Sequence, residues 1–299
     1  MVALCRKPES LADLRHPALR IAAGDLLDSA AWAPLLSGVE TVFHLAGVRQ
    51  RPGATAREMA AVNVEATLDL ARRAGEAGVG SFVHAATALI YGPSQHGETR
   101  SEQDGFDPAP TLYASSKAEA VRGIRALVRE GLPAVTVCPT LVFGPDHPSH
   151  PNRITSEIRR LLNGGPRVWI GGGRQVRNLV FVDDVVDGLL AAEERGAVGE
   201  EYLLGGEEVS PRELAGRVLA LRGGTASRLA LSVPGGAALV AAGIVDGLRG
   251  HEAGAGYATG VRNLLREWRF SSARAERDLG YRARPLTAGL SRTIDGLLR

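Results

Sequence analysis

Short apolar runs alternate with amphipathic stretches along the first half of this 299-residue chain. Helical periodicity is clearest over residues 57–77 and 112–130. The run 41–47 is almost continuously apolar, as strands covered by helices on both faces are. Strands are expected at 2–5, 19–23, 41–47, 81–87 and 134–138. This alternation predicts an α/β fold of the Rossmann type, with a doubly wound parallel sheet.

The pattern changes after about residue 145, where the pieces become shorter and richer in Gly and Pro. Expected elements here are helices at 153–162, 183–194 and 210–222, and strands at 168–170, 179–182 and 202–204. We therefore predict two domains. Residues 1–145 form a Rossmann-like domain, and residues 146–299 form a smaller α/β lobe with some segments returning to the sheet.

Composition narrows the class of partner. The formal net charge is only +2, and arginines are scattered among acidic residues. Neither nucleic acid nor a membrane surface is therefore expected as a partner. Cys5 and Cys138 each lie in a strand-like run, which favours reduced thiols and a cytoplasmic protein. The longest apolar stretch, 233–248, is too short and too interrupted by glycines to span a bilayer.

Tyr113 and Lys117 stand four residues apart at the start of the expected helix 112–130, so they share one helix face. An ammonium near a phenol lowers the phenol pKa from about 10 toward neutrality, which makes Tyr113 a candidate general acid or base. Lys7 and Lys117 are the only lysines among 35 Lys and Arg residues. Arginine does not titrate usefully, so a lysine kept here favours catalysis over a solvated surface pair.

Several further motifs accompany this pair in a fixed order. They are residues 25–28, 44–47, 63–64, Thr87 with 91–92, 139–140 with 143–145, and 182–184. In this combination almost the whole chain resembles the extended short-chain dehydrogenase/reductases. Within that group it resembles the NAD-dependent epimerase/dehydratases, and most of all their dihydroflavonol-reductase and 3β-hydroxysteroid-dehydrogenase branch. The resemblance implies an NAD(P)-dependent oxidoreductase that transfers hydride at a secondary alcohol or ketone of a small-molecule substrate. It implies that the domain 1–145 binds the dinucleotide and that the lobe 146–299 binds the substrate.

The same resemblance implies roles for individual residues. Tyr113 would transfer the proton, Lys117 would hold the ribose hydroxyls, and Thr87 would bond the substrate oxygen. The remaining cofactor contacts implied are Asp25 and Leu26 at the adenine, Ala46 and Gly47 where the cofactor approaches closely, Asn63 as a brace, and Pro139 and Thr140 beside the nicotinamide. A homodimer paired through 57–77 and 112–130 is also implied.

The chain departs from the family at its beginning. The family opens with a strand and a glycine-rich turn that places the pyrophosphate at a helix N-terminus. Here the first strand looks like the family's second, so we expect roughly thirty residues to precede Met1 in the natural polypeptide. The competing hypothesis is a short protein that binds dinucleotide poorly or not at all. The glycine-rich stretch 254–260 follows no apolar strand, so we interpret it as a flexible loop.

Cofactor choice is predicted from the end of the first strand. An acid there would bond the ribose 2′-hydroxyl of NAD, whereas an arginine suits a 2′-phosphate. Arg6 occupies this position, which favours NADP over NAD.

The sequence gives less information about the substrate than about the cofactor. Arg177 resembles an arginine that contacts the nucleotide diphosphate in sugar epimerases, and its planar donors suit phosphate. In contrast, 233–248 and 268–281 are more similar to the reductase branch, where the substrate is less polar. We slightly favour a carbonyl reductase or alcohol dehydrogenase. A nucleotide-sugar epimerase and a non-catalytic dinucleotide-sensing or inactive protein are the alternatives.

Neither water elimination from a sugar nor metal binding is expected. Thr87 is followed by Ala88 and Leu89, where sugar dehydratases carry the Asp-Glu pair that drives water elimination. His147 and His150 are three residues apart, but Pro148 breaks the helix that would align them, so no metal site is predicted.

Overall fold

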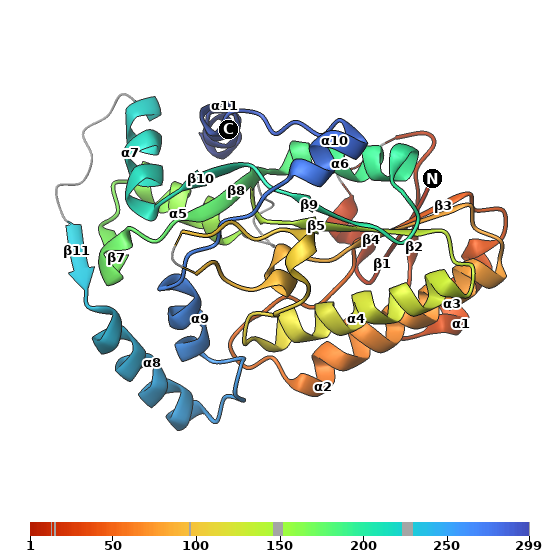
Figure 1. The fold of residues 1–299 in the computed structure, drawn as a ribbon, viewed down its shortest axis with the longest axis horizontal. Helices are drawn as coiled ribbons and strands as arrows, with labels where there is room; N and C mark the ends of the chain where they lie inside the picture. The colour runs from red at the N-terminus through yellow and green to blue at the C-terminus, as the bar shows by residue number, and fades with distance from the viewer. Residues whose placement is uncertain (13, 15, 96, 146–151, 223–229, 299) are drawn as a thin grey trace.

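The computed structural model describes residues 1–299 except 13, 15, 96, 146–151, 223–229 and 299. Its centre is a four-stranded parallel sheet in the order β3-β4-β5-β9. These strands are β3 (Thr41–His44), β4 (Ser81–Ala85), β5 (Ala134–Pro139) and β9 (Glu201–Leu204). Helices cover both faces, with α3 and α4 on one side and α6 and α10 on the other (Figure 1). The prediction of a Rossmann-like α/β fold is confirmed.

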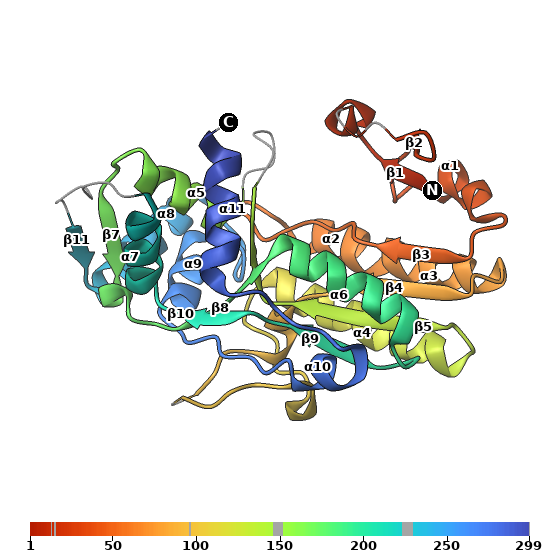
Figure 2. The same ribbon diagram turned by 90° about the horizontal axis from the view of Figure 1, so that it is seen from above.

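Two further strands form a separate parallel pair, β1 (Val2–Cys5) with β2 (Arg20–Ala23). Figure 2 shows this pair set apart from the four-stranded sheet. Among the described residues, no strand pairs with the edge of β3 that faces away from β4. Phe43 is consequently 37% exposed, and Leu45 beyond the strand end is 60% exposed. The side chains at this end of β3 are therefore less covered than the apolar run 41–47 predicts.

The predicted helix 57–77 is interrupted. It consists of α2 (Ala56–Met59), a π-helical segment η3 (Ala60–Glu65) and α3 (Ala66–Glu76). Thr55 caps the start, because its side chain accepts the Glu58 N–H. The π segment contains Asn63, and such segments are frequent at functional sites.

Helix α4 (Leu112–Arg129) and helix α5 (Arg153–Leu162) form close to where the sequence predicts them. Helix α6 (Val182–Arg195) begins one residue before the predicted helix, with Phe181 rather than Asp183 as its N-cap residue. Asp183 lies in the first turn instead and pairs with Arg292 at 2.7 Å. A carboxylate there still interacts favourably with the positive end of the helix dipole.

The C-terminal half contains a three-stranded sheet in the order β10-β8-β6 and a parallel pair, β11 with β7. Its strands are β6 (Leu141–Phe143), β7 (Arg167–Ile170), β8 (Arg177–Phe181), β10 (Glu207–Val209) and β11 (Ala230–Val233). Its remaining helices are α7 (Pro211–Arg222), α8 (Gly235–Arg249), α9 (Tyr257–Leu264), α10 (Ala273–Leu279) and α11 (Leu286–Leu298). The division into two domains at residue 145 stays a prediction.

Short helices connect these elements. They are η1 (Pro8–Leu11), α1 (Ser29–Trp32), η2 (Ala33–Leu36), η4 (Ala88–Tyr91), η5 (Glu102–Asp104) and η6 (Gly171–Gly173). Cys5 and Cys138 are free thiols, and only Cys138 is fully buried. Across the described part of the chain, no helix has the length and apolarity needed to cross a bilayer.

Candidate active site

Asn63 is the centre of a hydrogen-bond network at the carboxyl end of β3. Its side chain is fully buried. The side-chain carbonyl accepts the Val48 N–H at 2.7 Å, and the amide nitrogen donates to the Val48 carbonyl and to Ser116 Oγ, both at 3.0 Å. Ser116 in turn donates to the Tyr113 carbonyl at 2.9 Å. The loop after β3 is thereby fixed to the first turn of α4.

Lys117 lies beside this network. Its side chain is buried, and Nζ donates to the Ala85 carbonyl at the end of β4 at 2.8 Å. A Cβ added at Gly47 would lie 3.1 Å from Asn63 Oδ1 and 3.4 Å from Lys117 Nζ. The structure therefore brings Gly47, Asn63 and Lys117 together. Burial lowers the pKa of Lys117 to about 8, because the charged ammonium is poorly solvated there.

Tyr113 has a pKa that differs from the sequence prediction. Burial raises the pKa of its phenol to about 12, and the positive charge of Arg49 partly opposes this shift. Lys117 bonds the Ala85 carbonyl rather than the phenol, so the expected lowering is not observed in this structure. Arg49 was not singled out from the sequence, although it follows Gly47 by only two residues.

Thr87 follows β4 and is the N-cap residue of η4, where its hydroxyl accepts the Leu89 N–H at 3.4 Å. Pro139 closes β5 beside Leu204 of β9. Thr140 donates its hydroxyl proton to Asn178 Oδ1 at 2.9 Å. Because parallel strands end at one edge of the sheet, these residues lie at the same edge as Gly47.

The predicted adenine contacts lie on the separate pair of strands. Arg6 follows β1 and is exposed. Asp25 and Leu26 follow β2, and Asp25 Oδ1 accepts the Leu27 N–H at 3.0 Å, as a turn residue does. In the described part of the chain, no hydrogen bond or ion pair joins them to Tyr113 or Lys117. Ala46 is exposed between β3 and Gly47.

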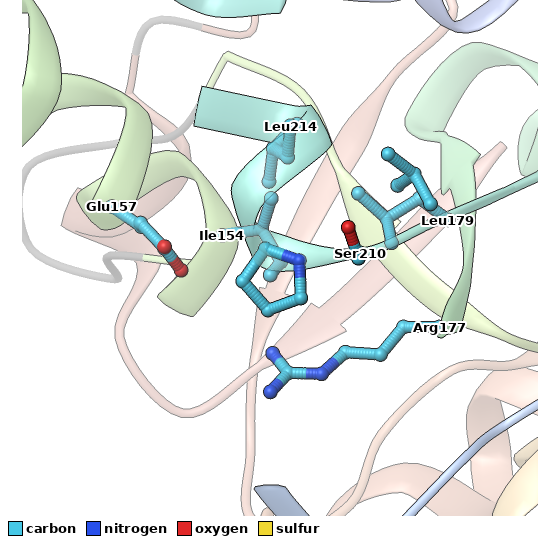
Figure 3. A pocket seen from close by; sticks show the side chains of 8 residues that line it. Ile154, Glu157, Arg177, Leu179, Ser210 and Leu214 are labelled. Atoms are coloured by element: carbon cyan, nitrogen blue, oxygen red, sulfur yellow. The ribbon is translucent and has the colours of Figure 1, made fainter. Parts of the chain in front are cut away.

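Arg177 occupies a different position, at the start of β8. Figure 3 shows its side chain together with those of Ile154, Glu157, Ser210 and Leu214, which line the same small cavity. The cavity has a volume of about 10 Å³. Burial lowers its pKa to about 10, and the nearby charge of Arg153 adds to this shift. Among the described residues, neither arginine forms an ion pair. Arg153 was not identified from the sequence, and its only signal is its place at the start of α5.

Two buried histidines, His44 on β3 and His84 on β4, interact electrostatically with Lys117. The rings of His44 and His84 stack with centroids 5.5 Å apart, and His44 Nε2 is hydrogen-bonded to Thr67 Oγ1 at 2.8 Å. Both ring nitrogens of His84 are buried without a partner. Burial, with a smaller contribution from Lys117, lowers the pKa of His44 to about 3 and that of His84 well below its usual value.

The described residues contain no cluster of three or more side chains able to hold a metal ion. His147 and His150 lie outside the described residues.

Comparison with known proteins identifies the family. The dTDP-glucose 4,6-dehydratase of Streptomyces griseus is 33% identical over 72% of this chain, and the match spans 66% of that protein, just under two thirds. The sterol demethylase protein B of Methylococcus capsulatus is 28% identical over 77% of this chain and 69% of that protein. A double mutant of DesIV, a dTDP-glucose 4,6-dehydratase of Streptomyces venezuelae solved with NAD and DAU, superposes with a TM-score of 0.78 at 27% identity, covering 100% of this chain and 87% of that one.

These relatives do not single out the dihydroflavonol-reductase and steroid-dehydrogenase branch. Two of the three are sugar-nucleotide dehydratases by name. The match to a family extends over residues 1–205. The chain belongs to the NAD dependent epimerase/dehydratase family.

Proposed function

We propose that this protein is an NAD(P)-dependent oxidoreductase that acts on a secondary alcohol or ketone of a nucleotide-linked sugar, with Tyr113 as the acid–base group. The observation that carries the proposal is the convergence of Gly47, Asn63 and Lys117 next to the first turn of α4. A buried lysine that bonds a backbone carbonyl, next to a glycine whose Cβ would lie tight against Asn63 and Lys117, suits close approach of a dinucleotide. A cytoplasmic homodimer is part of the same proposal.

The residues present fit the nicotinamide half of a dinucleotide. Gly47 leaves open the space that a Cβ would fill beside Lys117 Nζ. Lys117 and Tyr113 would hold the ribose, Ala46 and Gly47 would face the cofactor, and Pro139 with Thr140 would border the carboxamide. Asp25 and Leu26 would hold the adenine. When bound, the nicotinamide supplies a reversible hydride acceptor.

Side chains of the protein would donate and accept the proton in this reaction. A phenol with a pKa of about 12 is protonated at neutral pH, so Tyr113 begins as a proton donor toward a carbonyl. In the reverse direction it must first lose its proton, and a charged Lys117 nearby would favour that form. Thr87 would bond the same substrate oxygen. Asn63 keeps the first turn of α4 in place through Ser116.

The substrate class is argued from Arg177 and Arg153. Arg177 lines the small cavity, and among the described residues neither it nor Arg153 forms an ion pair, although the carboxylate of Glu157 interacts electrostatically with both. Diphosphate oxygens would replace the water that each guanidinium loses on burial. This favours nucleotide-linked sugars over the less polar ketones that the sequence slightly favours. No carboxylate follows Thr87, because Ala88 and Leu89 occupy those positions, so hydride transfer or epimerisation is favoured over water elimination.

A second candidate is reduction of a less polar ketone. Helix α8 exposes large apolar side chains, with Val240 and Leu248 at 66% and 83%. One relative is also named for sterol demethylation. Incubation with UDP- or dTDP-glucose, NAD and NADP separates the candidates. Epimerised sugar without net NADH supports an epimerase, and NADH release supports a dehydrogenase. In a parallel incubation with NADH or NADPH, reduction of a steroid ketone by either dinucleotide, with no reaction of the sugar nucleotides, supports the second candidate.

We expect Arg177→Ala to weaken binding of the sugar nucleotide about 10- to 100-fold, because charge-assisted hydrogen bonds contribute about 1.5–3 kcal/mol. Isothermal titration with UDP-glucose and dTDP-glucose measures the change. Arg174→Ala is the matched control, because Arg174 is exposed three residues away. Equal affinity in both variants would remove Arg177 from the substrate site and favour the apolar ketone.

Cofactor preference is tested at Arg6. If its guanidinium pairs with a 2′-phosphate, Arg6→Ala should weaken NADPH binding about 5- to 10-fold and leave NADH binding unchanged, as expected for one exposed ion pair of about 1 kcal/mol. Tryptophan fluorescence during titration reports both affinities. Tighter binding of NADH than of NADPH by the unmodified protein, with no effect of Arg6→Ala, would make NAD the cofactor, as in the DesIV structure.

A further inference from the structure

The connection between α8 and α9, residues 250–256, lies against the helix that carries Tyr113 (Figure 1). We call this connection the strap. The sequence predicts a flexible loop over 254–260, but residues from Tyr257 onward form the first turn of α9. Asp246 anchors this turn by accepting the N–H groups of Tyr257 at 2.7 Å and Ala258 at 2.8 Å. The interpretation as a flexible loop is therefore wrong for residues 257–260, which are helical.

The strap helps to complete the N-terminus of α4. The first N–H groups of a helix have no partner within the helix itself. Here the Leu112 N–H donates to the Gly254 carbonyl at 3.3 Å, and the Tyr113 N–H donates to Gln50 Oε1 at 3.2 Å. The Gln50 amide nitrogen also donates to the Gly254 carbonyl at 2.8 Å. One glutamine side chain thus links the Tyr113 backbone to the strap.

The strap is held at two further points. Glu252 Oε2 accepts the Ala56 N–H at the start of α2 at 2.8 Å. His251 Nδ1 lies 2.9 Å from Asp246 Oδ1, which ties the strap to α8. Gly254 has a φ of +84°, and a Cβ there would lie 3.2 Å from the Leu112 nitrogen. The close approach to α4 therefore requires a glycine.

From these contacts we propose that Gln50 is a positioning residue that couples docking of the strap to the placement of Tyr113. Tyr113 lies in the first turn of its helix, where backbone N–H groups depend on partners from outside the helix. Both outside partners are contributed by distant parts of the chain, the loop after β3 and the strap. When the strap is docked, the tyrosine backbone is fixed. When it is released, Gln50 loses its bond to Gly254 and the Leu112 N–H loses its acceptor, while Thr111 still caps α4 through the Ala114 N–H.

This proposal rests on the proposed function, because its kinetic readout is turnover by Tyr113. Small misplacements of a catalytic group cost up to about 100-fold in rate. We expect Gln50→Ala, which removes both bonds, to lower kcat about 10- to 100-fold with the KM for the cofactor unchanged. Gln50→Glu keeps an oxygen for the Tyr113 N–H but cannot donate to Gly254, so kcat should fall similarly. Gln103→Ala, at an exposed site on η5, should leave kcat unchanged.

Two results would overturn the coupling. Full kcat in Gln50→Ala shows that the link is dispensable, and full kcat in Gln50→Glu reduces Gln50 to a simple helix cap. Amide hydrogen exchange of the unmodified protein gives a further test. It depends neither on enzymatic activity nor on whether a variant folds. Under the proposal the amides of Leu112 and Tyr113 exchange with the same opening free energy as the strap amides of His251 and Ala255. Clearly different opening free energies would contradict it, whatever reaction the protein catalyses.

Discussion

Tyr113→Phe is expected to lower turnover by about 10²–10⁴-fold, the usual contribution of one acid–base group. Phenylalanine keeps the ring and its packing but has no exchangeable proton. Affinity for the nicotinamide dinucleotide should therefore change by no more than about tenfold, because one neutral hydrogen bond contributes about 0.5–1.5 kcal/mol to binding. Initial rates and fluorescence titration measure the two quantities independently.

The pH dependence gives a second readout of the same residue. Burial holds the pKa of Tyr113 at about 12, so the phenolate fraction rises about tenfold per pH unit below that value. Alcohol oxidation should therefore accelerate from pH 7 to 9, and Tyr113→Phe should lose this slope. Tyr257→Phe, at an exposed position on α9, is the control and should keep it. Loss of turnover together with cofactor affinity in Tyr113→Phe would indicate a structural tyrosine.

The protein is expected to lose stability steeply as the pH falls below 6.5. His44 has a folded-state pKa of about 3, and that of His84 is also well below its usual value, whereas both titrate near 6.5 when unfolded. Between these limits the unfolded chain binds protons that the folded chain does not, so the free energy of unfolding decreases with falling pH. Above pH 6.5 both states are neutral and the effect vanishes.

Each histidine contributes a slope of about 1.4 kcal/mol per pH unit, or about 3 kcal/mol for the pair. Because the free energy of unfolding is about 5–15 kcal/mol in total, a loss of this size per pH unit would unfold the protein within a few pH units. Urea unfolding at pH 7, 6 and 5 measures it. His84→Leu should halve the slope and leave stability at pH 7 nearly unchanged, because the ring nitrogens of His84 have no partner to lose.

The control for this experiment is the exposed His16. His16→Gln should leave the slope unchanged. A slope in the unmodified protein below about 1 kcal/mol per pH unit would show that the folded state accepts protons on this histidine pair, contrary to its burial.

The sequence predicted the parallel sheet because strand-length apolar runs and helical periodicity carry that information directly. It could not predict the π segment around Asn63, because one extra residue in a turn leaves the apolar period nearly unchanged. Short strands such as β6 and β10 were missed, since three residues show no period. The exposure of Phe43 depends on which strand lies at the edge, which is a tertiary property.

For the site as well, sequence patterns predicted the residues, whereas properties that depend on the folded structure could not be predicted. The motif order located Tyr113, Lys117 and Gly47, and the structure places Gly47 and Lys117 in near contact. The direction of the Tyr113 pKa shift was wrong, because burial dominates it and a four-residue spacing contains no information on burial. The strap was missed because glycine spacing signals loops, whereas the carboxylate that organises this stretch, Asp246, belongs to the preceding helix.

Because β1 and β2 are separate from the main sheet, the N-terminal region is attached to the rest of the protein by different contacts from those within the sheet. No strand-to-strand hydrogen bonds join this pair to the other described strands, so its attachment relies on side chains such as Leu4 and Leu26 packing beside Trp32 and Phe82. Apolar contact is non-directional and tolerates sliding, whereas a ladder fixes register. The proposed adenine contacts, Asp25 and Leu26, therefore lie on a pair of strands that meets the main sheet through side-chain packing, and a dinucleotide that contacted both parts would add a direct link between them.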